Sequence, residues 1–178
     1  MSLDDLLLQH KKIVLRTWLD LLLSTYPPET ERMFKKESDQ FANPVGHTFT
    51  VALGEILDEF LHTNNPEKLA PLLDRIIRIR AVQEFSPSQA LSFIFSLKRI
   101  AAKIHTEGGE DRRVRDDMSA FEAKVDELAL LAFDVYTRCR ENLFEVRMKE
   151  LKDRTYRLLQ RAEIIGDVPP QEPGEEKP

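Results

Sequence analysis

The side chains best suited to chemistry are two glutamates and a histidine that one helical face would carry together. Glu55, Glu59 and His62 stand four and three residues apart, and residues at these spacings are neighbours on a helix. Glu59 and His62 form a Glu-x-x-His pair, the motif that di-iron bundles use twice together with two more glutamates. The residues three positions before the other histidines supply no second copy, since they are Leu7, Pro44 and Ala102. We therefore expect a solvated acidic edge, with no metal site and no cofactor.

The single cysteine, Cys139, is the one thiol that could act as a nucleophile. A reactive cysteine needs its pKa lowered by a nearby cation or by a helix N-terminus. Arg138 and Arg140 flank it in the sequence, but adjacent residues on a helix point in different directions. The sequence also lacks GxGxxG, P-loop, HExxH, CxxC and GxSxG motifs. We expect a buried, inert thiol and no enzymatic activity.

Basic residues in two neighbouring segments could together bind an anion. They are Arg75, Arg78, Arg80, Lys98, Arg99 and Lys103. A phosphate site is usually completed by backbone N–H groups in a glycine-rich loop, and no such loop accompanies these residues. The expectation is therefore a charged helix face that nearby acidic side chains neutralise.

Length and composition restrict the class of protein. The chain has 178 residues, of which 42% are hydrophobic and 32% charged, and its formal net charge is −5. This length predicts one domain, and the acidic balance disfavours binding of nucleic acid through a basic surface. The longest apolar run, 128–133, cannot cross a bilayer, which takes about 20 residues. One cysteine and an N-terminus without a basic signal region indicate a cytoplasmic protein without direct membrane insertion.

The spacing of apolar residues is helical along almost the whole sequence, and it predicts an all-α fold of about six helices. Residues suited to helix caps mark several boundaries. Ser2 precedes the first apolar stripe, and Ser86, Pro87 and Gln89 form a capping-box pattern. The expected helices are 2–26, 29–36, 44–61, 66–82, 87–108 and about 118–162. Pro71 either kinks the helix 66–82 or is its true start, with 66–70 as a preceding turn.

The last helix is expected to be long, about 45 residues, because no glycine or proline occurs between Gly109 and Gly166. From Met118 to Val146 its apolar residues alternate spacings of three and four, which is typical of a seam against another helix. Part of this helix should face the chain's own core, and its far end should contact a partner. The candidate interaction surface is Phe121, Val125, Leu128, Val135, Phe144, Arg147, Leu151, Tyr156 and Leu158. We expect a homodimer that uses this helix.

The C-terminal residues differ in composition from the rest. The segment 166–178 contains four of the ten prolines, four acidic residues and one lysine. It lacks the apolar content that offsets the loss of chain entropy on folding. The sequence therefore predicts a helical domain over 2–165 and a disordered, dispensable tail over 166–178.

Several stretches resemble one known family. The run 73–90, LDRIIRIRAVQEFSPSQA, and its continuation 93–98, FIFSLK, are similar to the signature of the RsbRD N-terminal domain family. The segment around Trp18 and the stretch 146–150 extend the likeness, which covers most of residues 3–160. The family resembles the sensory N-terminal domains of the RsbT co-antagonist proteins of bacterial stressosomes.

The resemblance implies a fold and a function. It implies a non-haem, globin-like bundle that is dimeric and regulates a downstream protein partner in stress-response signalling. In those proteins a STAS domain follows, whereas this sequence ends in the tail, so we expect a stand-alone sensor-type domain. Stand-alone members also resemble proteins encoded beside the membrane sulfite-reduction complex of sulfate reducers. A redox-linked accessory protein and a ligand-binding or haem-binding globin-like sensor are therefore the alternatives.

The sequence can be searched for the proximal ligand that a haem-binding globin needs. A haem globin carries its proximal histidine about eight residues before the proline that opens the next helix. Eight residues before Pro87 stands Ile79, and 72–85 contains no histidine, cysteine or tyrosine, although haem iron needs a ligand of such a type. His47 could ligate iron only from the opposite side. We expect a haem-free domain.

Overall fold

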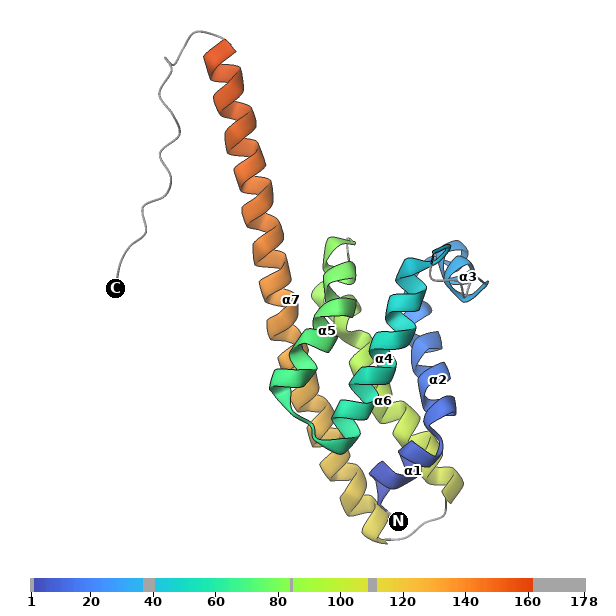
Figure 1. The fold of residues 1–178 in the computed structure, drawn as a ribbon. Coiled ribbons are helices and arrows are strands. Elements are labelled where there is room, and N and C mark those ends of the chain that lie inside the picture. The colour runs from blue at the N-terminus through green and yellow to red at the C-terminus, as the bar shows by residue number, and fades with distance from the viewer. Residues whose placement is uncertain (1, 37–40, 84, 109–111, 162–178) are drawn as a thin grey trace, which may run out of the picture. The chain divides into compact units, whose positions relative to one another are not determined.

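The computed structural model describes residues 2–36, 41–83, 85–108 and 112–161, and these residues form helices joined by short turns (Figure 1). The helices are α1 (Leu3–Gln9), α2 (Lys11–Leu23), α3 (Pro28–Lys36), α4 (Pro44–His62), α5 (Pro66–Val82), α6 (Pro87–Gly108) and α7 (Arg112–Arg161). The predicted all-α class is confirmed. The predicted tail, 166–178, lies outside the described residues and stays a prediction.

Side-chain caps explain where several helices begin. The Ser2 hydroxyl accepts a hydrogen bond from the Asp5 backbone N–H at 3.2 Å, and the Ser2 N–H donates to the Asp5 carboxylate at 3.0 Å. Ser86 and Gln89 form the same reciprocal pair at the start of α6, with distances of 3.3 and 3.1 Å. Such caps satisfy N–H groups that have no partner inside the helix. Both predicted caps are confirmed.

The described residues form seven helices rather than about six, because the first expected helix is broken. His10, with φ −97° and ψ 17°, separates α1 from α2, and these dihedral angles lie outside the α-helical region. The break turns α1 toward α6. Leu3 and Leu7 of α1 are consequently almost fully buried, which supplies apolar burial that offsets the cost of the broken helix.

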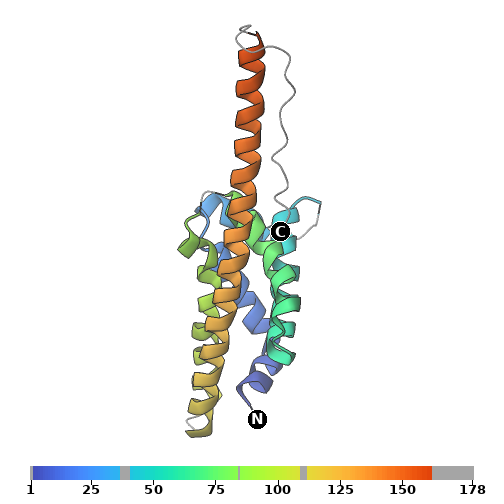
Figure 2. The ribbon, with the colours of Figure 1, turned by 90° about the vertical axis from the view of Figure 1, so that its left-hand side faces the viewer.

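The chain divides into two compact units, residues 1–140 and 141–178. The first unit holds α1 to α6 and the start of α7, and within it Figure 2 shows α7 running beside α6. The described part of the second unit is the rest of α7, 141–161. Among the described helices, none is both long enough and apolar enough to cross a membrane.

Aromatic side chains fill the interior of the first unit. Trp18 of α2 is fully buried, and its indole N–H donates to the Phe93 carbonyl of α6 at 2.7 Å. Phe49 and Phe60, both from α4, are also fully buried. Burying side chains of this size supplies much of the apolar free energy of a domain. This packing fixes the positions of α6 and of the first part of α7, which carry the surface described next.

Candidate interaction surfaces

Four residues of the predicted interaction surface lie in the core of the first unit. Phe121, Val125, Leu128 and Val135 are all at most 4% exposed. The ring of Phe121 meets that of Phe60 edge to face, with the ring centroids 5.6 Å apart. Side chains this deeply buried offer no area to a partner, so their assignment to an interaction surface was wrong. The predicted seam of α7 is an intramolecular one over these residues.

The other five predicted residues belong to the second unit, and most of them are exposed. Phe144, Leu151 and Leu158 are 64%, 57% and 61% exposed. Arg147 is exposed as well, and Tyr156 is half-buried. Large apolar side chains gathered on one exposed segment mark interaction surfaces. The role of this segment as an interaction surface stays a prediction.

A hollow of about 660 Å³ lies beside these apolar residues on the second unit. Its lining combines Leu151 with three arginines, Arg147, Arg154 and Arg157, and two acidic residues, Glu150 and Asp153. In the part of the chain that the structure describes, none of these three arginines makes an ion pair. The hollow is thus partly apolar and carries a small excess of positive charge.

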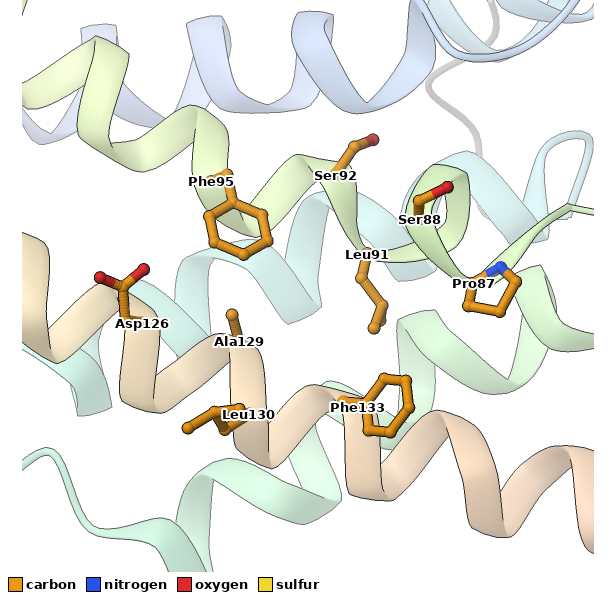
Figure 3. Close-up of a pocket in the computed structure, with 9 residues that line it drawn as sticks. All are labelled: Pro87, Ser88, Leu91, Ser92, Phe95, Asp126, Ala129, Leu130 and Phe133. Atoms are coloured by element: carbon orange, nitrogen blue, oxygen red, sulfur yellow. The ribbon is translucent and has the colours of Figure 1, made fainter.

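An apolar groove between α6 and α7 was missed by the sequence reasoning. It lies within the first unit and has a volume of about 680 Å³. Figure 3 shows Leu91 of α6 and Phe133 of α7 pointing toward each other, with Phe95 opposite Ala129 further along. The full lining is Pro87, Ser88, Leu91, Ser92, Phe95, Asp126, Ala129, Leu130 and Phe133.

The side chains around this groove are apolar and exposed, and the charges at its edge are balanced. Leu130, Phe133 and Phe95 are 70%, 51% and 48% exposed. Lys98 donates to both carboxylate oxygens of Asp126 at 2.8 and 2.9 Å. Paired charges leave little net field to repel a second molecule that carries the same surface. Asp126, the one charged side chain among the lining residues, is therefore neutralised by an ion pair.

Arg80 was predicted to lie on a charged face, and the structure buries it completely. Its guanidinium donates from Nε to the Ala90 carbonyl at 2.9 Å, and from Nη2 to the Gln89 carbonyl at 2.8 Å and the Thr25 hydroxyl at 2.9 Å. The guanidinium carbon lies 4.4 Å from the centroid of the Phe85 ring. The side chain thereby joins α5 to the start of α6 and to the end of α2.

Burial of this guanidinium costs free energy, which the surrounding contacts must offset. Burial lowers the pKa of Arg80 from its ordinary value, and neighbouring Tyr26 opposes the shift. The Nη1 atom is buried and makes no hydrogen bond among the described residues. A buried charge is tolerated when hydrogen bonds surround it. Here neutral oxygen atoms accept them, and the rings of Tyr26 and Phe85 add cation–π contacts. Arg80 therefore anchors the end of α5 to the start of α6.

Cys139 is buried, as predicted, and its environment makes it unreactive. The side chain is 8% exposed, and its thiol donates to the Asp74 carboxylate at 3.4 Å. Burial, followed by the hydrogen bond and the negative charge of Asp74, raises the pKa of the thiol to about 11. Because the thiolate is the nucleophilic form, this environment suppresses nucleophilic chemistry.

We predict that Cys139 of the folded protein reacts with iodoacetamide at pH 8 at least about 100-fold more slowly than a free cysteine, whose pKa is about 8.5. Unfolding in urea should restore the ordinary rate. The raised pKa stabilises the fold fully below about pH 9, and this contribution declines as the pH rises toward 11. Fast alkylation without unfolding, followed by mass spectrometry, would show that the thiol is accessible.

The acidic cluster on α4 is occupied by intramolecular partners. Glu55 forms an ion pair with Arg75, and Glu59 lies 3.8 Å from the Lys68 ammonium. The His62 Nδ1 atom lies 2.8 Å from the Asp58 carbonyl oxygen. Over the described ranges, no group of three or more histidine, cysteine or acidic side chains is arranged to hold a metal ion.

Three of the other basic residues singled out in the sequence, Arg75, Arg78 and Lys98, have acidic partners. Arg78 pairs with Asp74 at 2.6 Å, and Arg75 and Lys98 pair with the acids already named. Exposed pairs of this kind contribute about 0–1 kcal/mol each. The predicted neutralised face is therefore confirmed for these three residues and wrong for Arg80.

Comparison with known proteins gives the family. The family model for the RsbT co-antagonist protein RsbRD N-terminal domain matches residues 13–151. An uncharacterised protein from Archaeoglobus fulgidus is 29% identical over 143 residues, which cover 79% of this chain and 83% of that protein. No solved structure was found to match the chain. The matched region contains both the α6–α7 groove and most of α7, and the chain belongs to the RsbT co-antagonist RsbRD N-terminal domain family.

Proposed function

We propose that this chain is a non-enzymatic regulatory domain of the stressosome type, which works as a homodimer through protein–protein contact. The observation that carries the proposal is the α6–α7 groove, where Phe95, Leu130 and Phe133 remain largely exposed around an apolar hollow. Family membership supports a regulatory role. The Glu55 carboxylate of α4 is held in an ion pair, and the raised pKa of Cys139 keeps its thiol protonated. Neither group therefore supports an enzymatic function instead.

The groove suits a second copy of the same chain. Its floor is lined by Leu91 and Ala129, which are nearly buried, while Leu130 and Phe133 stand at its edge. In a two-fold interface each molecule presents the same patch. The edge residues of one molecule can then fill the hollow of the other. The Lys98–Asp126 pair keeps the patch neutral, so that two copies do not repel each other.

A single glutamate in the groove should separate the dimer. In Phe133→Glu a carboxylate would have to be buried without a partner, which costs several kcal/mol. We expect the wild-type chain to have the mass of a dimer in light scattering and this variant to have the mass of a monomer. Because Phe133 is half exposed in one copy, the helical circular dichroism signal should not change.

The matched control is Phe144→Glu, which places the same change on the second unit. That variant should stay dimeric, because Phe144 does not line the groove. A wild-type chain that is monomeric at high micromolar concentration would refute the proposal. If Phe133→Glu remained a dimer, the dimer interface would have to lie outside the groove.

A further inference from the structure

The described part of the second unit carries an exposed seam with the spacing of a coiled coil. Its positions alternate by four and three residues and are Phe144, Met148, Leu151, Thr155 and Leu158. The four apolar members are between 36% and 64% exposed. Apolar residues at this spacing normally insert between the side chains of a facing helix. The seam therefore has the form of a surface for one more helix.

Basic side chains border this seam. In heptad notation Phe144, Leu151 and Leu158 are d positions, which makes Arg147, Arg154 and Arg161 successive g positions. The e positions are Glu145, Lys152 and Leu159. The two borders thus hold four basic side chains and one acidic side chain, in a chain whose overall charge is −5. Charges at e and g positions determine which partner a coiled coil accepts.

These charges disfavour a second copy of the chain as the occupant. In a parallel pair, a g residue faces the e residue of the next heptad, so that Arg147 would face Lys152 of the other copy. In an antiparallel pair, g residues face each other, and arginine would meet arginine. Like charges at these positions select against a pairing. The seam is therefore built for a different helix.

The arginines of this segment differ from three lysines of the first unit. There, Lys11, Lys98 and Lys124 each have a carboxylate partner. Among the described residues, the exposed Arg147 and Arg154 have none. Exposed cations beside an apolar seam attract a partner with the complementary charge and guide its approach.

The width of the seam favours a helix, rather than an anionic membrane surface, as its binding partner. Helices that lie on membranes have a broad apolar face and a polar face rich in lysine and arginine. Here four of the five large exposed apolar residues of 141–161, all but Val146, form a narrow seam of two columns, as in a coiled coil. Glu150 and Asp153, at c and f positions, line the same hollow as Leu151 and the arginines, so an anionic membrane would meet repelling negative charge there as well.

We propose that the seam of Phe144, Met148, Leu151 and Leu158 binds an α-helix of another protein whose apolar residues are bordered by glutamate or aspartate. The acidic side chains of that helix pair with Arg147 and Arg154. This assignment rests on the proposed regulatory function and names the chemistry of its partner. It uses a surface separate from the groove that the homodimer uses.

The test uses the full chain and two synthetic four-heptad peptides. Both carry leucine at the a and d positions. One has glutamate at every e and g position, and the other has lysine there. By fluorescence anisotropy we expect the acidic peptide to bind at least about tenfold more tightly than the basic peptide, because the charged borders determine specificity. The difference should shrink as salt is added.

The paired variant Arg147→Glu with Arg154→Glu is the specific control. Both positions are exposed on α7, so the change should leave helicity intact while it reverses the preference toward the basic peptide. The matched control, Arg75→Glu with Arg78→Glu on α5, should retain the preference for the acidic peptide. Equal binding of both peptides, or no binding, would overturn the proposal.

Two further outcomes would also overturn it. One is stronger binding of the chain to vesicles of phosphatidylserine and phosphatidylcholine than to the acidic peptide. The other is loss of the dimer in the Arg147→Glu with Arg154→Glu variant, which would make a second copy the occupant. The mass of each variant is measured in parallel. A dimer that binds no peptide refutes the partner assignment alone, and a monomer that binds the peptide refutes the homodimer alone.

Discussion

Replacing Arg80 with alanine is expected to lower the free energy of unfolding by about 3–5 kcal/mol. The change removes three hydrogen bonds from a charged donor, to Ala90, Gln89 and Thr25. It also leaves space beside the ring of Phe85, over which the guanidinium lies. For a chain of this length, the melting temperature should fall by about 10 °C. Urea unfolding followed by circular dichroism measures the effect.

Two further substitutions identify the cause of this loss. Arg80→Lys keeps the charge but cannot reproduce the planar fork of donors, so it should be clearly destabilised too. Arg78→Ala removes an exposed arginine that pairs with Asp74 at 2.6 Å, and it should cost less than about 1 kcal/mol. If Arg80→Ala cost no more than Arg78→Ala, the anchoring role of Arg80 would be wrong.

Replacing Phe121 with alanine is expected to cost about 3–5 kcal/mol of unfolding free energy. The residue is 2% exposed, and its ring lies against that of Phe60 at a centroid distance of 5.6 Å. Removal of the ring leaves a cavity that the surrounding side chains refill only in part. The effect should appear in urea unfolding as a lower midpoint with an unchanged slope.

Phe144→Ala is the matched control, since it makes the same chemical change at an exposed site of the same helix. Phe144 is 64% exposed, and its removal should change the stability by less than about 0.5 kcal/mol. Similar losses from the two variants would show that these positions of α7 are not divided between core and surface as described. A loss confined to Phe144→Ala would reverse the assignment.

Local chemistry explains the parts of the fold that could be predicted from sequence. The caps at Ser2 and Ser86 each depend on a side chain three residues further along the chain. The helical spacing of apolar residues also repeats within a few turns. Such signals need no knowledge of the tertiary fold. The all-α class and the long last helix were therefore accessible from sequence alone.

The features that sequence reasoning missed depend on contacts between distant residues. Arg80 stands among other arginines in a pattern typical of a polar face, and its burial depends on Thr25, which is 55 residues away. On α7, the seam through Phe121 and Val125 is buried, while Leu130 and Phe133 lie exposed. Spacing identifies the apolar residues of a helix, but it does not show which of them other helices cover.

The most direct test of the whole account is one sedimentation-velocity experiment on two variants in the presence of the labelled acidic peptide. We predict that Phe133→Glu sediments as a monomer that still carries the peptide. The variant Arg147→Glu with Arg154→Glu should sediment as a dimer without the peptide. The two contact surfaces would then be separate, one for a second copy and one for a partner helix. If either variant lost both properties, or if wild-type protein were a monomer that bound no peptide, the account would be contradicted.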